Sequence, residues 1–238
     1  MALSTPYIGF YNQNPYGLGL APPVTPEGEG KYAGNPIVIL GGSSSVGQNG
    51  KLRYYLSPRN LPVVMMSTIS AIQLAKLSGF SLIITTASLK HTEYLKSIGA
   101  THVVDRTVSA SALASEISNI TQNAPIKYAL DSISLPDTQQ VAYDLIAPGG
   151  QLIVVLPVTV KTTTEKDIFH VYGLATAPEN IKLLETFYHS NLERLLKEGA
   201  IKVSYSHKCS SVHVDQLLWD SRTKLKYCQT VLREYRMG

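Results

Sequence analysis

The chain contains little cysteine, little charge and no long hydrophobic run. Its two cysteines, Cys209 and Cys228, lie near the end of the 238-residue sequence, at a spacing that matches neither a zinc ribbon nor a disulfide framework. No stretch approaches the roughly 18 consecutive apolar residues of a membrane span, and the first residues lack the basic and apolar regions of a signal peptide. We therefore expect a cytoplasmic protein that is neither exported nor inserted into a membrane.

Charged residues make up only 16% of the chain and give a formal net charge of +4. The 21 lysines and arginines are scattered, so they form no basic stripe of the kind that binds nucleic acid. The six histidines form no pair at metal-ligand spacing and no cysteine precedes Cys209, which argues against a metal site. A small anionic ligand is compatible with this charge balance.

From Pro36 onward the sequence alternates between apolar runs and helical patterns. The apolar runs predict five strands, at residues 36–42, 81–87, 101–105, 126–133 and 151–158. Helical patterns follow at residues 71–79, 88–99, 109–121, 136–147 and 178–198. This order predicts an α/β fold with a doubly wound parallel sheet of the Rossmann type, covered by helices on both faces. Residues 1–35, rich in Gly, Pro and Tyr, are expected to form a surface connection.

The most informative segment is the turn GGSSSVGQ, residues 41–48, which directly follows the first apolar strand. Gly42 and Gly47 occupy the outer positions of a G-x-G-x-x-G pattern, whereas Ser44 stands at the middle glycine. Backbone N–H groups of such a turn, and of the helix after it, can bind a pyrophosphate. A glycine-rich turn that merely connects a strand to a helix explains the same residues, so the pattern by itself leaves the ligand open.

The end of the second strand, TTASLK, favours NADP(H) over NAD(H). An acidic residue about 20 positions after the turn would bind the free ribose 2′-hydroxyl of NAD, but no carboxylate precedes Glu93. The hydroxyl of Ser88 and the ammonium of Lys90 suit a 2′-phosphate instead. An ordinary helix cap and a solvated lysine remain alternative interpretations of these two residues.

The spacing between these two motifs predicts an insertion. Ser88 lies 41 residues after Gly47, about twice the interval that this unit allows. The 22 residues 49–70 lack helical periodicity and contain Pro58 and Pro62, and removing them shortens the interval to 19. The helix would then begin directly after the turn.

The insertion suggests a hypothesis about its origin. Gly50-Lys51 can be encoded by GGTAAG and Val203-Ser204 by GTAAGT, and both resemble splice-donor sequences. We hypothesise that residues 49–70 are translated intron, and that the irregular tail at residues 203–238 is a second such read-through. Sequencing the mature transcript tests this hypothesis.

Four segments together resemble a known family: VILGGSSSVGQ, AIQLAKLSGF, IITTASLKHTEYLKSIGATHVVD and APGGQLIVVL. They are similar to the cofactor domain of the medium-chain dehydrogenase/reductase superfamily, and most similar to zinc-free quinone-oxidoreductase-like proteins and fungal trans-acting enoyl reductases. The resemblance covers roughly residues 30–202 apart from the insertion. It implies an NADP-binding domain at residues 36–202, a linker remnant of a substrate domain at residues 1–35, and an aberrant tail at residues 203–238.

The resemblance also implies which residues contact the cofactor. The turn would bind the pyrophosphate, Ser88 and Lys90 the 2′-phosphate, and Arg106 would lie near the adenine or be an ordinary exposed loop arginine. Residues after the fourth and fifth strands would line the nicotinamide side. The full set of expected cofactor contacts is Gly42, Ser43, Ser44, Ser45, Val46, Gly47, Ser88, Lys90, Arg106, Ser132, Ile133 and Leu156. No catalytic residue is assigned, and Asp131 is expected to order the turn beside it.

Several functions remain open at this point. The resemblance implies reduction of an activated C=C bond, with hydride delivered to the β-carbon and a proton to the α-carbon. In relatives a separate barrel-like domain supplies most substrate contacts, so a nucleotide-binding protein without catalysis, derived from a truncated or mis-spliced reductase, is the alternative. A methyltransferase-like domain is a further possibility, against which Ser88 and Lys90 argue. Finally, the insertion could displace the helix after the turn and uncover the phosphate site.

Overall fold

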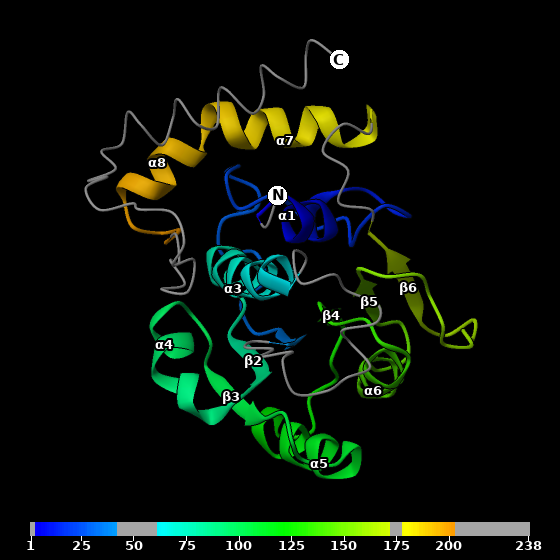
Figure 1. Ribbon diagram of the computed structural model, residues 1–238. Coiled ribbons are helices and arrows are strands. Elements are labelled where there is room, and N and C mark those ends of the chain that lie inside the picture. Colours follow the sequence, from blue (N-terminus) through cyan, green and yellow to red (C-terminus); the bar gives the residue numbers. More distant parts are fainter. Residues whose placement is uncertain (1–2, 42–60, 172–177, 203–238) are drawn as a thin grey trace.

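The computed structural model describes residues 3–41, 61–171 and 178–202 (Figure 1). A parallel sheet lies at its centre, with the strands in the order β3-β2-β1-β4-β5-β6. The predicted doubly wound α/β fold is therefore confirmed. The strands are β1 (Pro36–Leu40), β2 (Leu82–Ala87), β3 (His102–Asp105), β4 (Tyr128–Asp131), β5 (Gln151–Val154) and β6 (Asp167–His170).

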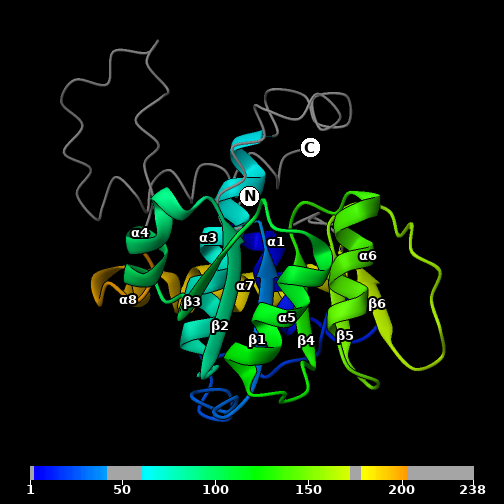
Figure 2. The ribbon, with the colours of Figure 1, turned by 90° about the horizontal axis from the view of Figure 1, so that it is seen from below.

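Helices cover both faces of this sheet (Figures 1 and 2). On one face lie α1 and α3, with α7 packed outside α1, while α5 and α6 lie on the other face. The helices are α1 (Ser4–Tyr11), α3 (Leu61–Leu77), the short 3-10 helix η1 (Leu89–His91), α4 (Thr92–Ser97), α5 (Ala110–Thr121), α6 (Pro136–Leu145), α7 (Pro178–Ser190) and α8 (Leu192–Lys197).

The burial pattern of the central strand β1 explains why the protein has two hydrophobic cores, one on each face of the sheet. All five of its residues are buried, and successive side chains of a strand point to opposite faces of the sheet. Ile37 and Ile39 accordingly belong to the core beneath α1, α3 and α7. Val38 and Leu40 belong to the core beneath α5 and α6. A strand that is apolar at every position therefore needs helices on both sides.

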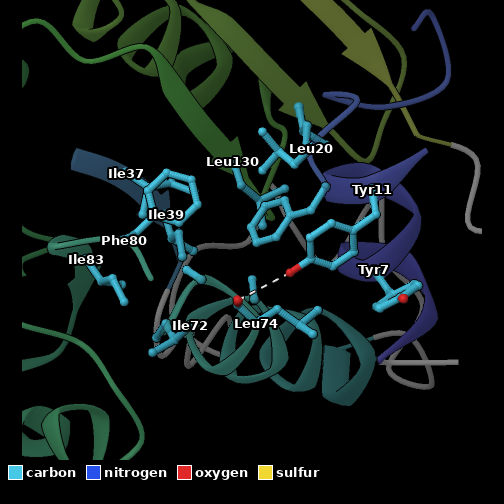
Figure 3. Packing of buried hydrophobic residues seen from close by; sticks show 14 of the residues in the cluster. Tyr7, Tyr11, Leu20, Ile37, Ile39, Ile72, Leu74, Phe80, Ile83 and Leu130 are labelled. Carbon is cyan, nitrogen blue, oxygen red and sulfur yellow. Dashed lines mark hydrogen bonds between the residues drawn. The ribbon is translucent and has the colours of Figure 1, made fainter. Parts of the chain in front are cut away.

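The expectation that residues 1–35 form a surface connection is wrong. Residues 4–11 form α1, whose aromatic side chains are buried in the larger core (Figure 3). The ring centroids of Tyr7 and Phe187 of α7 lie 4.0 Å apart. The hydroxyl of Tyr11 lies 2.7 Å from the hydroxyl oxygen of Ser78 and donates to the carbonyl of Leu74, at 3.3 Å. Burial of the aromatic rings thus overrides a composition typical of loops.

The predicted insertion also needs correction in its second half. Residues 61–70 were expected to lack helical structure, but they form the first part of α3, which continues without a break to Leu77. Pro62 is compatible with this helix because an N–H group in the first turn has no intrahelical acceptor. Ser67, Thr68 and Ile69 are buried. The first half, residues 49–60, lies outside the described residues.

Two further elements differ from prediction. The strand β6 was not predicted, and it extends the sheet beyond β5. The single helix expected over residues 178–198 is interrupted at Asn191 and forms α7 and α8. The tail at residues 203–238 lies outside the described part of the chain, so the proposed division into linker, cofactor domain and tail stays a prediction. No helix among the described residues is both long and apolar enough to cross a membrane.

Candidate cofactor site

The carboxyl ends of the strands meet at one edge of the sheet and bring the predicted residues together. In the register, Leu40 pairs with both Thr86 and Asp131, at the ends of the strands on either side of β1. The strand order reverses between β1 and β4, because β2 and β3 lie on one side of β1 while β4, β5 and β6 lie on the other. In open α/β sheets, ligands bind outside the carboxyl ends of the strands at such a switch point.

Gly41 begins the turn at this switch point. Its φ of +100° lies in the left-handed region that favours glycine. A Cβ atom at this position would lie 2.8 Å from the Ser132 hydroxyl oxygen and 2.9 Å from Ile133 Cγ1. The Gly41 N–H donates to the Thr86 hydroxyl at 3.1 Å. The chain therefore leaves β1 through a position that no larger residue fits. The predicted pyrophosphate contacts that follow it lie outside the described residues: Gly42, Ser43, Ser44, Ser45, Val46 and Gly47.

Ser132, predicted to line the nicotinamide side, is buried where β4 ends. Its hydroxyl donates to the Leu40 carbonyl at 2.7 Å, and its oxygen lies 2.5 Å from the hydroxyl oxygen of Thr68 in α3. Because the Ser132 proton points to Leu40, Thr68 is the donor of the second bond. The Ser132 side chain thus ties α3 to the ends of β1 and β4. The neighbouring residues Ile133 and Leu156 are half-buried at the same edge.

Asp131 orders the turn after β4, as predicted. Its Oδ1 accepts hydrogen bonds from the N–H groups of Ile133 and Ser134, both at 2.9 Å. Its Oδ2 accepts from the Thr138 hydroxyl at 2.6 Å. The carboxyl is fully buried, and desolvation raises its pKa to about 6 in spite of these three bonds. All the described hydrogen bonds of this carboxyl lie within the turn and the first turn of α6, and they fix the backbone conformation of residues 132–134.

The predicted residues Ser88, Lys90 and Arg106 follow the ends of the neighbouring strands β2 and β3. Ser88 follows β2 directly, and the Arg106 N–H donates to the carbonyl of Ala87 at 3.0 Å, so the two segments lie side by side. Ser88 does not cap η1 through its side chain, which removes the ordinary helix cap as its explanation. The pKa of His91 is lowered by burial and then by the positive charges of Lys90 and Arg106. The positive charges of Lys90 and Arg106 therefore both reach the surroundings of His91.

One carboxylate, Asp105, lies next to Arg106 in the chain and interacts with its positive charge. The nearest acidic residue in the strand pattern is Asp105, the last residue of β3. Its Oδ1 accepts from the N–H and the hydroxyl of Thr107, at 2.9 and 2.8 Å, and these bonds lower its pKa. Among the described residues, Lys90 forms no salt bridge. Within the described ranges, no three His, Cys, Asp or Glu side chains are grouped so that they could hold a metal ion.

Sequence reasoning missed two residues of this edge. Thr68 fell within the predicted insertion, and nothing local to it indicates a bond to Ser132, which is 64 residues away. Gly41 was assigned to the strand, although a glycine pair after an apolar run is a signal for a positive φ. Both residues act through contacts between elements that are distant in sequence.

Comparisons with known proteins agree with this geometry. A profile of the zinc-binding dehydrogenase family matches residues 69–196, which is more than half of the chain. The trans-enoyl reductase himH of Aspergillus japonicus is 34% identical over 128 residues, covering 53% of this chain and 30% of the relative. The dual trans-enoyl reductase/FAD-dependent monooxygenase tazHJ of Aspergillus terreus is 28% identical, covering 78% of this chain and 25% of the relative.

Solved structures share the fold at lower sequence identity. The CurK enoyl reductase superposes with a TM-score of 0.57 at 16% identity, covering 86% of this chain and 52% of that chain. Benzyl alcohol dehydrogenase from Acinetobacter calcoaceticus gives a TM-score of 0.54 at 19% identity, and the match covers 84% of this chain and 45% of that chain. The chain thus spans about half the length of these structures and aligns with less than a third of the curated relatives. It belongs to the zinc-binding dehydrogenase family, within the medium-chain dehydrogenase/reductase superfamily, and carries that family's nicotinamide-nucleotide-binding fold.

Proposed function

We propose that this chain binds NADP(H) along the carboxyl edge of its sheet, as the cofactor-binding part of a reductase of activated C=C bonds. The observation that carries the proposal is the group formed by Ser88, Lys90 and Arg106 at the ends of β2 and β3. A hydroxyl and two cations fit a dianionic 2′-phosphate, whereas the ribose 2′-hydroxyl of NAD(H) calls for a carboxylate at this place. Burial first, and then the positive charges of Lys90 and Arg106, lower the pKa of His91, which supports the proposal that both cations act at this place.

The remaining cofactor contacts follow the order of the strands. Arg106, after β3, lies toward the adenine in this proposal, and the turn at residues 42–47 toward the pyrophosphate. The nicotinamide would lie near residues 132–133 and Leu156, after β4 and β5. Because the Ser132 hydroxyl is already bonded to Leu40 and Thr68, we expect its backbone rather than its side chain to face the nicotinamide.

The reaction proposed is the one named for the relatives, trans-enoyl reduction. When bound, NADPH supplies the hydride. The residues of this chain hold the adenosine end and shield the nicotinamide edge, where Ile133 and Leu156 provide apolar surface. No described residue is proposed as the proton donor, because the only buried carboxyl at this edge, Asp131, is committed to its turn.

Titration of the purified protein with NADPH and NADH tests the 2′-phosphate site. Replacing the ammonium in Lys90→Ala removes a charge-assisted bond that is worth about 1.5 to 3 kcal/mol, so NADPH affinity should fall by about tenfold or more. NADH affinity should not change, because NADH has no 2′-phosphate. The same pattern with a smaller loss is expected for Arg106→Ala, because this side chain lies toward the adenine in our proposal.

The matched control is Lys127→Ala. Lys127 is exposed and precedes β4, so it lies at the opposite, amino edge of the sheet. Its removal changes the net charge by the same amount and should leave both affinities unchanged. Equal losses in Lys90→Ala and Lys127→Ala, or equal binding of NADPH and NADH by the parent protein, would contradict the proposal.

A further inference from the structure

Hydrogen bonds of buried side chains join the two loops that line the nicotinamide in the proposed function. One loop, residues 132–135, follows β4, and the other, residues 155–159, begins the connection after β5. The two strands are neighbours, and Asp131 pairs with Val154 where they end. Loops at such an edge are usually more mobile than the strands that they follow. Bonds between the two loops therefore restrict a motion that the sheet alone would allow.

Gln139, in α6, uses its whole side-chain amide for this connection. The side chain is 0% exposed. Its Nε2 donates to the carbonyls of Ser134 and Pro157, at 2.8 and 3.0 Å. Its Oε1 accepts from the N–H and the hydroxyl of Thr159, at 2.9 and 3.1 Å. A glutamine amide has two N–H donors and two acceptor lone pairs. All of them are thus used, one toward the loop after β4 and three toward the loop after β5.

Ser134 makes a second connection between the same loops. Its side chain is buried, and its hydroxyl donates to the Asp131 carbonyl at 2.6 Å and accepts from the Val155 N–H at 2.8 Å. Its φ of +55° lies in the left-handed region that few residues other than glycine adopt. A glycine would take this conformation without strain but would lose both bonds of the hydroxyl.

These bonds fix the two apolar residues beside the proposed nicotinamide site. Ile133 directly precedes Ser134, and Leu156 lies between Val155 and Pro157, which are bonded to Ser134 and to α6. Both apolar side chains are half-buried. A misplacement of about 1 Å in a reacting group can slow a reaction about 100-fold. The spacing between the two loops therefore matters for how a nicotinamide ring is held.

We propose that Gln139 is a positioning residue, which sets the spacing of Ile133 and Leu156 and thereby holds the nicotinamide half of the cofactor. This proposal rests on the proposed function, because it takes the ring to lie against these two residues. Gln139 is fully buried, so it acts through the two loops and not by contact with the ring. The 2′-phosphate site follows β2 and β3, on the other side of β1, and does not depend on Gln139.

Calorimetric titration with NADPH and with adenosine 2′,5′-bisphosphate separates the two ends of the cofactor. Gln139→Met fills a similar volume and removes the four bonds of the amide. The affinity for NADPH should fall by about tenfold, whereas the affinity for the bisphosphate should stay within about twofold. Equal losses for both ligands, or no loss for either, would overturn the proposal, because a residue that only stabilises the fold affects both ligands alike.

Gln140→Met is the matched control. Gln140 is the next residue of α6, is exposed, and donates from its Nε2 to Asp144 Oδ1 within the same helix, at 2.9 Å. Both affinities should be unchanged, and a loss of NADPH affinity as large as in Gln139→Met would contradict the role of Gln139. Ser134→Gly suits the positive φ and removes the second connection, so it should lower the NADPH affinity alone, by a smaller factor. This variant carries the test if Gln139→Met does not fold.

Amide hydrogen exchange of the parent protein tests the same point without any substitution. The N–H groups of Val155 and Thr159 donate to Ser134 and Gln139. NADPH should slow their exchange about tenfold more than adenosine 2′,5′-bisphosphate does, because only NADPH brings a ring to these loops. Equal effects of the two ligands would overturn the proposal and leave the 2′-phosphate site intact. That site fails separately, if the parent protein binds the bisphosphate no more tightly than 5′-AMP.

Discussion

At the scale of single residues, three positions determine the backbone path at the carboxyl edge of the sheet. Gly41 follows β1 and has a left-handed backbone conformation. Asp131 stabilises the turn after β4 by accepting three hydrogen bonds. Ser132 lies between them and bonds to Leu40 and Thr68. In our proposal Gly41 and Asp131 contact no cofactor, and Ser132 faces the nicotinamide only through its backbone. They fix the ends of β1 and β4, in the middle of the edge at which Ser88, Lys90 and Arg106 follow β2 and β3.

Gly41→Ala should destabilise the protein by about 2 to 4 kcal/mol, since it combines left-handed backbone strain with overpacking against Ser132 and Ile133. Gly149→Ala is the control. Gly149 also has a positive φ, +74°, but no atom lies within 4 Å of the position of its added Cβ. It should cost only the backbone strain, about 1 kcal/mol. Urea denaturation of both variants measures the difference, and equal losses would show that the close approach to Ser132 is unimportant.

Asp131 should make stability depend on pH in an identifiable window. Burial raises its pKa from 3.8 to about 6 in the folded protein, so the folded state binds the proton more tightly than the unfolded state. Its contribution to the free energy of unfolding is therefore fully present below about pH 4 and is lost as pH rises through about 6. At about 1.4 kcal/mol per pKa unit, the loss is about 3 kcal/mol.

The Asp131→Asn variant measures this contribution. Unfolding free energies of the parent protein minus those of Asp131→Asn should fall by about 3 kcal/mol between pH 4 and pH 7. The control Asp137→Asn removes an exposed carboxylate in the first turn of α6, next along the chain, and so accounts for the loss of one negative charge. A constant difference between the parent protein and Asp131→Asn across this range would show that Asp131 is not desolvated.

At the scale of helices and strands, α1 is part of the fold rather than a connection to it. It contacts α3 and α7, and the Asn12 side-chain amide donates to the Asn180 side-chain oxygen at 2.6 Å, inside the protein. The hydroxyls of Ser4 and Tyr188 lie 2.7 Å apart. These bonds join residues more than 160 positions apart in the sequence. The α1 helix therefore closes one face of the sheet together with α7.

Phe10→Ala tests this role of α1. The Phe10 side chain is 0% exposed, and truncation of a buried aromatic ring costs about 3 to 5 kcal/mol. Tyr16→Ala removes an aromatic ring that is 51% exposed, just after α1, and should cost less than about 0.5 kcal/mol. Thermal or urea unfolding distinguishes the two. Similar small losses in both variants would mean that α1 does not contribute to the core.

Elements with a simple pattern could be predicted from the sequence, and the others show why prediction failed. All five apolar runs contain strands, and four of these, β1, β2, β4 and β5, are largely buried on both faces, so their composition alone identifies them. The strand β6 has an exposed first residue, Asp167, and lies at the sheet edge, where burial imposes little pattern. Almost every residue of α1 is buried, so the helix lacks the alternation of apolar and polar residues that marks an amphipathic helix. In α3, Pro62 suggested a helix breaker, although a first-turn proline is harmless.

At the scale of the whole molecule, the candidate site follows from topology rather than from any one motif. Parallel strands place all their carboxyl ends at one edge, and the order β3-β2-β1-β4-β5-β6 creates the switch point. The sequence therefore predicts the neighbourhood of Ser88, Arg106 and Ser132 once the strands are identified. It does not predict that residues 61–70 belong to α3, because the bond that joins this helix to the edge, between Thr68 and Ser132, links residues 64 positions apart.

The aromatic cluster between α1 and α7 also gives the protein an optical signature. The described residues contain no tryptophan, since Trp219 lies outside them, so their asymmetric environment is sampled chiefly by tyrosine. Tyr7 and Tyr11 are held edge to face at 4.7 Å between ring centroids, in a rigid interior. Fixed tyrosines give near-ultraviolet circular dichroism that disappears when tertiary packing loosens while helices persist. Detachment of the first helix can thus be followed spectroscopically, without any introduced label.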